Sequence, residues 1–223
     1  MKNKLQFSLL IYEVNQLHSE IAILEQLPRL IEQIRNRTIL LGPTEGVLSV
    51  LFDGKELLGE AYWADIDFFV HDMFFSLPRL MNQEEIHLEM PETSTRIILK
   101  LDTENILYEL RQKTQGNWET LTKSTIPSQL FVRQCIQFYF RIARIFAVLG
   151  EQFNVPSDFD VENPEDRKRI EEAIIGHNYA DKLKRWQDLE PVQLLSNDEK
   201  EELGKLISMP LEQWVAQSDC NGE

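Results

Sequence analysis

Four runs of alternating apolar and polar residues, between residues 85 and 123, constrain the fold more than any other feature of the chain. The runs are EIHLEM, RIILKL, NILYELRQ and WETLTK, and the segments PETST, DTE and QGN lie between them. A period of two residues is typical of strands that bury one face and leave the other in water. Short turn segments join antiparallel neighbours. We therefore expect an antiparallel meander with one buried and one solvent-exposed face.

The exposed face of this predicted meander carries charges of both signs. Glu85 and Glu89 occupy polar positions on the first run, and Arg96 and Lys100 occupy polar positions on the second. Opposite charges on neighbouring strands attract one another across the strands. The pattern predicts cross-strand ion pairs on this face.

A long helix is predicted over residues 128–150, SQLFVRQCIQFYFRIARIFAVLG, with Gly150 at its end. Apolar residues cover most of its circumference, so we expect it to pack on the sheet. A polar stripe remains, formed by Arg133, Gln137, Arg141 and Arg144. This stripe is either an anion site or a set of arginines that pair with nearby carboxylates.

The N-terminal third combines helical and extended patterns. Residues 20–37 have helical spacing, whereas residues 5–14 fit either a strand or a helix. TILL and GVLSVLF are rich in strand-forming residues, and Asp53-Gly54 predicts a tight hairpin directly after them. A helix is expected from about residue 65 to residue 80.

The C-terminal part is predicted to be helical, over residues 164–175, 178–189 and 197–207. Asn163 and Ser196 stand where helix N-caps are expected, and Glu199 completes a capping box with Ser196. The predicted fold class is therefore α+β, an antiparallel β-meander packed against a long helix, with additional C-terminal helices. We expect an α+β domain over residues 1–152 and a C-terminal helical extension or subdomain over residues 153–223.

The formal net charge of −14 bears on the partners of the protein. Such a charge repels phosphate backbones and anionic lipid, so we expect neither nucleic-acid nor membrane binding. It attracts a basic protein partner, and it also keeps a protein soluble. The two cysteines, Cys135 and Cys220, have no metal-ligand or disulfide spacing, and no cleavable leader is recognised. We expect a cytoplasmic protein without a metal or cofactor.

The segment WADIDFFVHDMFF, residues 63–75, is the most site-like patch. Asp67 and His71 lie four positions apart, on one face of a helix, and could share a metal ion or a proton. The alternative is an ordinary helix start, in which Asp65 is the N-cap, Asp67 favours the helix dipole, and the phenylalanines face the core. We adopt this second interpretation, and expect no catalytic residue.

The order of elements resembles a known family. The stretch VLSVLFDGKELLGEAYWADIDFFVHDMFFSLPRL and the run from EIHLEM to RIARIFAVLG, about half of the chain, resemble the layout of small acidic immunity proteins. Bacteria carry such proteins beside polymorphic toxins. The resemblance implies a non-enzymatic cytoplasmic protein that binds a cognate toxin and blocks it by occlusion. The helical part after residue 150 has no counterpart in that layout.

The expected partner-binding residues are carboxylates and tryptophans. They are Asp53, Glu56 and Glu60 near the hairpin, Glu85 and Glu89 on the strand face, and the anchors Trp63 and Trp118. Trp63 is either an anchor or a core residue. One alternative function is a secretion adaptor, chaperone or regulatory accessory module. The other is an enzyme of unrecognised type, with the Asp67–His71 patch or the Arg141–Arg144 stripe as its site.

Overall fold

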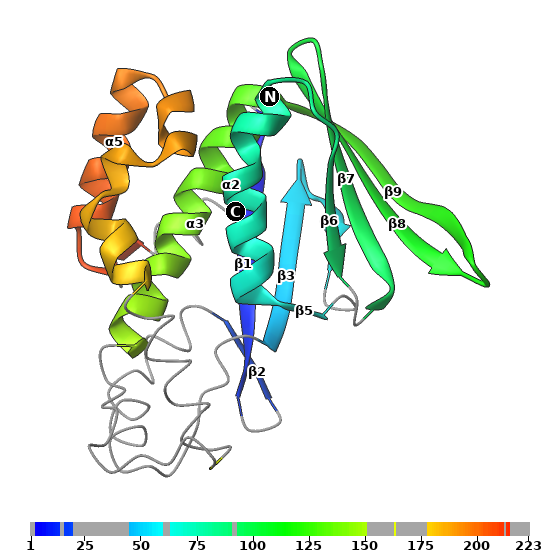
Figure 1. Cartoon of the computed structure of the whole chain (residues 1–223), viewed down its shortest axis with the longest axis horizontal. Coiled ribbons are helices and arrows are strands. Elements are labelled where there is room, and N and C mark those ends of the chain that lie inside the picture. Colours follow the sequence, from blue (N-terminus) through cyan, green and yellow to red (C-terminus); the bar gives the residue numbers. More distant parts are fainter. Residues whose placement is uncertain are drawn as a thin grey trace.

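The computed structural model describes residues 3–13, 16–19, 45–59, 63–90, 93–150, 163, 178–211 and 213–214. The predicted helices over 20–37 and 164–175, and the predicted domain boundary at residue 152, lie outside these residues. Within them the chain forms two antiparallel sheets and a layer of helices, as Figure 1 shows. The predicted α+β fold class is confirmed.

The first sheet is built by the N-terminal third of the chain. Its strands are β1 (Leu5–Glu13), β2 (Gln16–Ser19), β3 (Glu45–Phe52), β4 (Lys55–Leu58) and β5 (Trp63–Asp65). They are ordered β2-β1-β3-β4, and β5 pairs with β3 as well. The described part of the ambiguous segment, Leu5–Glu13, is thus a strand, and its register sets Leu5 opposite Phe52.

The β3–β4 hairpin turns at Asp53 and Gly54, as predicted. Both residues have positive φ, +49° and +77°, which is the backbone geometry of a type I′ turn. The turn also holds the start of β1. The Asp53 backbone N–H donates to the Lys4 carbonyl at 2.8 Å, and the Lys4 N–H donates to Asp53 Oδ1 at 2.7 Å.

The second sheet is the predicted meander. Its strands β6 (Ile86–Met90), β7 (Thr95–Asp102), β8 (Asn105–Thr114) and β9 (Asn117–Pro127) pair in chain order. Leu110 lies opposite Thr122 and Arg111 opposite Thr120, so Leu121 is the extra residue of a β-bulge in β9. Alternate residues of the strands, such as Ile86, Leu88 and Met90 of β6, are buried.

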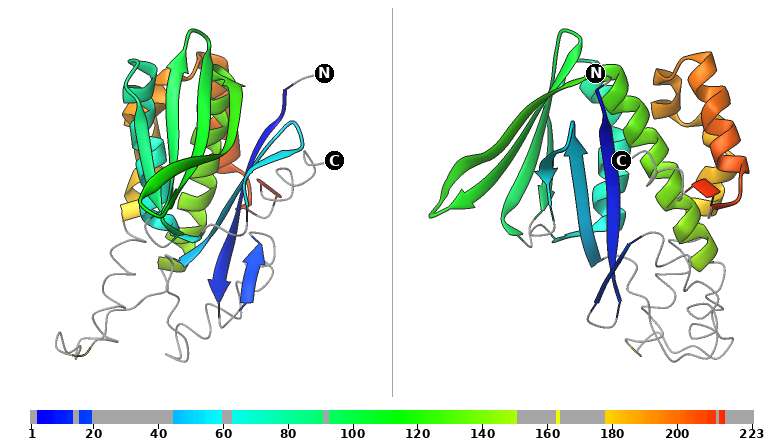
Figure 2. Two further views of the ribbon diagram at one scale, coloured as in Figure 1. Left: turned by 90° about the vertical axis from the view of Figure 1, so that its right-hand side faces the viewer. Right: turned by 180° about the vertical axis from the view of Figure 1, so that it is seen from behind.

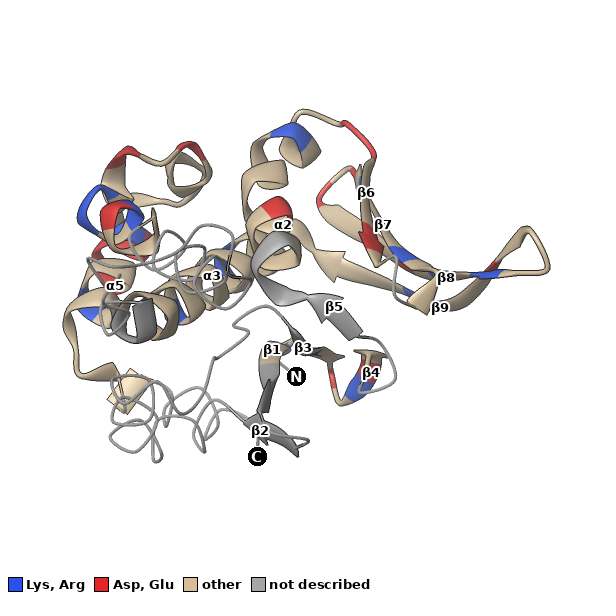
Figure 3. Ribbon diagram, turned by 60° about the horizontal axis from the view of Figure 1, so that its bottom comes forward, with Lys and Arg blue, Asp and Glu red and all other residues tan. Residues whose placement is uncertain are grey.

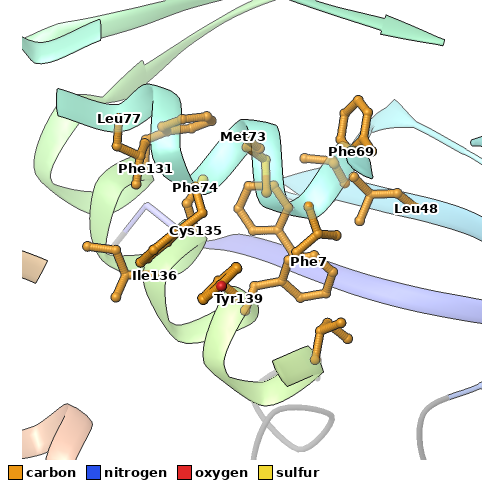
Figure 4. Packing of buried hydrophobic residues seen from close by; sticks show 14 of the residues in the cluster. Phe7, Leu48, Phe69, Met73, Phe74, Leu77, Phe131, Cys135, Ile136 and Tyr139 are labelled. Atoms are coloured by element: carbon orange, nitrogen blue, oxygen red, sulfur yellow. The ribbon is translucent and has the colours of Figure 1, made fainter. Parts of the chain in front are cut away.

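Two helices cover the buried faces. Helix α2 (Ile66–Met81) and helix α3 (Ser128–Gly150) confirm the helices predicted over these segments. Figure 4 shows the core between them, where the rings of Phe74 and Tyr139 stack with centroids 3.8 Å apart. Phe7 of β1 stacks on Phe138 of α3 at 5.5 Å, so the first sheet shares this core.

The described C-terminal residues pack against both α2 and α3. Residues 178–184 are helical, and they are followed by the 3₁₀ turns η2 (Trp186–Asp188) and η3 (Glu190–Leu194) and by α5 (Asn197–Ser208). The predicted helix over 178–189 is therefore too long, because the chain turns at Arg185 and continues in the tighter 3₁₀ conformation of η2. The helix predicted over 197–207 and its Ser196–Glu199 capping box are confirmed.

Candidate protein-binding face

The second sheet has one face that none of the described helices or strands covers. The left view of Figure 2 shows this face toward the viewer, with the helices behind it. We call it the outer face. Its residues are Glu85, His87, Glu89, Arg96, Ile98, Lys100, Leu107, Glu109, Arg111, Lys113, Trp118, Thr120 and Lys123.

An arginine and a tryptophan stack on the outer face. The guanidinium carbon of Arg96 lies 3.4 Å from the centroid of the Trp118 ring. Trp118 is paired with Lys113 of β8, so its ring must extend across β8 to reach Arg96 on β7. The stack is a cation–π contact, and it leaves the Arg96 side chain only 18% exposed and Trp118 half-buried.

A chain of polar contacts surrounds Arg96. Glu89 Oε1 lies 3.6 Å from Arg96 Nη1, and His87 Nδ1 lies 3.5 Å from the same nitrogen. His87 Nε2 is 2.7 Å from Glu85 Oε1. These partners assign the His87 proton to Nε2, which donates to Glu85, while Nδ1 accepts from Arg96. The hydrogen bond from His87 Nε2 lowers the pKa of Glu85 below its usual value.

Glu109 is the centre of a second group of contacts. Arg111 donates two hydrogen bonds to its carboxylate, one of them from Nε at 2.9 Å, and Lys123 Nζ approaches at 3.3 Å. Burial opposes ionisation, but the hydrogen bonds from Arg111 and Lys123 outweigh it and lower the pKa of Glu109. The Glu89–Arg96 and Glu109–Lys123 contacts confirm the predicted cross-strand ion pairs.

The register also places like charges together. Arg96 and Arg111 lie directly opposite one another on β7 and β8. Lys113, two residues beyond Arg111 on the same face, is exposed. The basic residues of β7 and β8 are visible as blue bands in Figure 3. The end of the outer face near the β8–β9 turn is therefore basic, although the protein as a whole is acidic.

Three of the seven predicted binding residues, Glu85, Glu89 and Trp118, share the outer face. Their place on one face follows from strand alternation and was predictable. That Arg96 and Arg111 lie opposite one another was not predicted from the sequence, although the turn DTEN at residues 102–105 fixes the register of the two strands. A two-residue turn at Thr103 and Glu104 pairs Asp102 with Asn105, and the remaining pairs follow by counting.

The other four predicted residues are not on the outer face or cannot be placed. Asp53 and Glu56 belong to the β3–β4 hairpin, which contacts the edge of the sheet where Lys55 Nζ donates to the Lys123 carbonyl at 3.2 Å. Glu60 lies outside the described residues. Trp63 pairs with Val47 through its backbone in β5, and its side chain is outside the description.

In the Asp67–His71 patch, the structure describes the surroundings of His71. His71 Nδ1 is 3.8 Å from Asp72 Oδ1, and its ring lies 4.5 Å from that of Phe75. The Asp67 side chain is outside the description. Among the residues that the structure describes, no three His, Cys, Asp or Glu side chains are arranged to hold a metal ion. The apolar stripe of α2 is buried as predicted, at Phe69, Val70, Met73, Phe74 and Leu77.

The arginines of α3 make structural contacts. Arg141, which is buried, donates from Nη2 to the Phe7 carbonyl of β1 at 2.8 Å. Arg144 donates from Nη1 to the Leu206 carbonyl of α5 at 3.2 Å. Both bonds join α3 to a neighbouring element through a backbone oxygen.

A groove of about 600 Å³ lies between η2 and α5. It is lined by Trp186, Gln187, Lys200, Glu201, Gly204, Lys205 and Ser208. Lys205 pairs with Glu201 at 2.6 Å, and Lys200 donates to Gln193 Oε1 at 3.0 Å. The lysines of the groove thus already have partners, so the groove is a weaker candidate site than the outer face.

The chain matches no protein-family model, no curated protein and no solved structure. No helix within the described parts of the chain combines the length and the apolar character that crossing a membrane requires.

Proposed function

We propose that this chain is a non-enzymatic binding protein that uses the outer face to bind another protein and blocks that protein by occlusion. The observation that carries the proposal is the Arg96–Trp118 stack on a sheet face that no described element covers. Tryptophan and arginine are the residue types most enriched among those that dominate binding energies. Here they lie side by side and remain partly accessible.

The rigidity of the face favours binding. The backbone is held in four paired strands, Arg96 is stacked on Trp118, and Glu109 is bound by Arg111. Side chains that are already ordered lose less conformational entropy when a partner binds. The outer face is therefore suited to contact a folded surface without rearrangement.

The finer proposal is that the partner is a bacterial toxin and that the chain is its cytoplasmic immunity protein. Two observations support it: the layout resemblance of the sequence and the net charge of −14. A strong negative field accelerates association with a basic partner. A basic nuclease would be such a partner, since its active site is built to attract phosphates.

Affinity capture tests the proposal. The tagged native chain, the Trp118→Ala variant and a Leu194→Ala control, which removes an exposed apolar side chain on η3, are incubated with an extract of the source cells. We expect one protein to be retained by the native chain and the control. Its affinity for Trp118→Ala should be lower by about 30-fold, the effect of a residue worth about 2 kcal/mol.

The captured protein then decides the finer proposal. A toxin whose activity is abolished by one equivalent of the chain supports immunity. A partner that stays active or is held unfolded indicates an adaptor or chaperone instead. Equal retention by the native chain and by Trp118→Ala would show that the outer face is not the binding surface.

A further inference from the structure

We propose that the basic end of the outer face is a carboxylate-binding site, formed by Arg96, Arg111 and Lys113 beside Trp118, which binds an acidic segment of the protein partner. This inference rests on the proposed function, since it assigns the chemistry of the partner at the same face.

Like charges lie opposite one another at the basic end of the outer face. Arg96 and Arg111 face each other in register, an arrangement that destabilises an antiparallel pair. Glu89 and Glu109 offset two of the charges, at 3.6 Å from Arg96 and in hydrogen bonds to Arg111. Lys113 adds a third positive charge, and no carboxylate among the described residues pairs with it. A bound carboxylate would relieve this local excess of positive charge.

The hydrogen-bond donors of Arg96 are not all satisfied by the described residues. Arg96 Nε is buried, and no described group accepts its hydrogen bond. The contacts of Arg96 Nη1 with His87 and Glu89, at 3.5 and 3.6 Å, are longer than good hydrogen bonds. The guanidinium is therefore held in place by the Trp118 ring more than by acceptors. Because Nε is itself buried, a partner's carboxylate would bind the terminal Nη nitrogens, whose present contacts are long. Such nitrogens suit a carboxylate, which can accept two parallel hydrogen bonds.

Partly exposed apolar side chains lie on β9 beside the basic end. Trp118 is half-buried, and Leu121, three residues along β9 at the β-bulge, is 42% exposed. These side chains can contact an aliphatic or aromatic neighbour of the carboxylate. The segment that fits is one in which Asp or Glu residues stand next to apolar residues.

The protein as a whole is negatively charged, whereas the basic end of the outer face is positively charged. The net charge of −14 governs the approach of a partner, whereas charges on the outer face act within the Debye length of about 8 Å at physiological salt. A partner that satisfies both conditions is basic overall and carries a local acidic segment. This differs from the prediction that Glu85 and Glu89 contact basic residues, since both carboxylates already have partners on the face.

A library of random twelve-residue peptides, displayed on phage and panned against the immobilised full chain, tests the inference. We expect enriched peptides to contain Asp or Glu beside apolar residues. Synthetic copies should bind the Lys113→Glu variant about 10-fold more weakly or worse, as the loss of a charge-assisted contact predicts. Lys100→Glu is the matched control, because it reverses an exposed charge at the other end of the same face. Its affinity should change less than 2-fold.

The outcomes separate the inference from the proposed function. Enriched peptides that are rich in Lys and Arg, or acidic peptides that bind Lys113→Glu as well as the native chain, would overturn the carboxylate site. If those peptides still lose affinity with Trp118→Ala, the proposed function stands. Peptides that are insensitive to Trp118→Ala contradict the proposed function itself. A selection without enrichment counts against the carboxylate site.

Discussion

Arg96 and Trp118 are in contact, 3.4 Å from guanidinium carbon to ring centroid, although they belong to strands β7 and β9 that are not neighbours. The Trp118 side chain therefore lies across β8. A single contact thus connects three of the four strands on the outer face. It also holds the half-buried Trp118 ring in place on the outer face.

The contact should contribute measurably to folding. In a double-mutant cycle of Arg96→Ala and Trp118→Ala, we expect a coupling energy of about 1 kcal/mol, between the values for exposed and desolvated cation–π pairs. Urea unfolding provides the free energies. The exposed Arg79–Glu84 pair is the control and should couple by about 0.5 kcal/mol or less. Equal coupling in the two cycles would show that the stack adds nothing beyond a surface ion pair.

Asp53 should contribute to the stability of the fold and not to partner binding. Replacing it with Ala removes the acceptor for the Lys4 N–H and should lower the free energy of unfolding by about 1 kcal/mol. Glu56→Ala, on the same hairpin, should cost less because this side chain is exposed. Neither change should weaken the binding of a captured partner. A loss of affinity with Asp53→Ala at unchanged stability would place the hairpin in the binding surface after all.

Glu109 should make stability depend on pH. Its folded-state pKa is lowered, so its ion pairs stabilise the fold above the unfolded-state pKa of glutamate and are lost as pH falls through the lower folded value. Urea unfolding at pH values from 7 to 3 gives the free energy of unfolding of the native chain and of Glu109→Gln. The native chain should be the more stable of the two at pH 7, and this difference should shrink as the pH falls into the acidic range. A stability difference that is independent of pH would contradict the assignment.

Phe74 should be among the most important core residues. It is fully buried, stacked on Tyr139 at 3.8 Å and edge-on to Phe140. Phe74→Ala should lower the free energy of unfolding by about 3–5 kcal/mol. Phe75→Ala, which truncates a half-buried neighbour on the same helix, should cost clearly less. Phe74→Leu keeps the measurement possible if the alanine variant does not fold. Similar losses for Phe74→Leu and Phe75→Leu would contradict the packing.

The sequence was informative where structure depends on local pattern. Alternation gave the meander, Asp53-Gly54 gave the hairpin, and helical spacing gave the bounds of α2 and α3. The pairing of β1 with β3 was not predicted, because the two strands are more than 30 residues apart in the chain, with Leu5 opposite Phe52. The alternating apolar residues of β1 also fit a helical period. Pairing between distant segments decided the outcome, and no local pattern encodes it.

The candidate site divides in the same way. Strand alternation placed Glu85, Glu89 and Trp118 on one face, because side-chain direction in a strand is local. The Arg96–Trp118 stack depends on a ring that extends across an intervening strand, which alternation cannot predict. Two arginines of α3 also make contacts that the sequence did not reveal. Arg141 and Arg144 donate to the Phe7 and Leu206 carbonyls, which tertiary packing brings to them.

Photo-cross-linking from the outer face tests the central claim most directly. The photoreactive residue p-benzoylphenylalanine replaces Thr120, which is exposed beside Trp118, or, in a control chain, Glu202 on α5. Each chain is expressed in the source cells and irradiated. The account predicts a discrete cross-linked protein from position 120 that is absent from position 202 and is lost when Trp118→Ala is added. The same product from both positions, or no product from position 120, would contradict it.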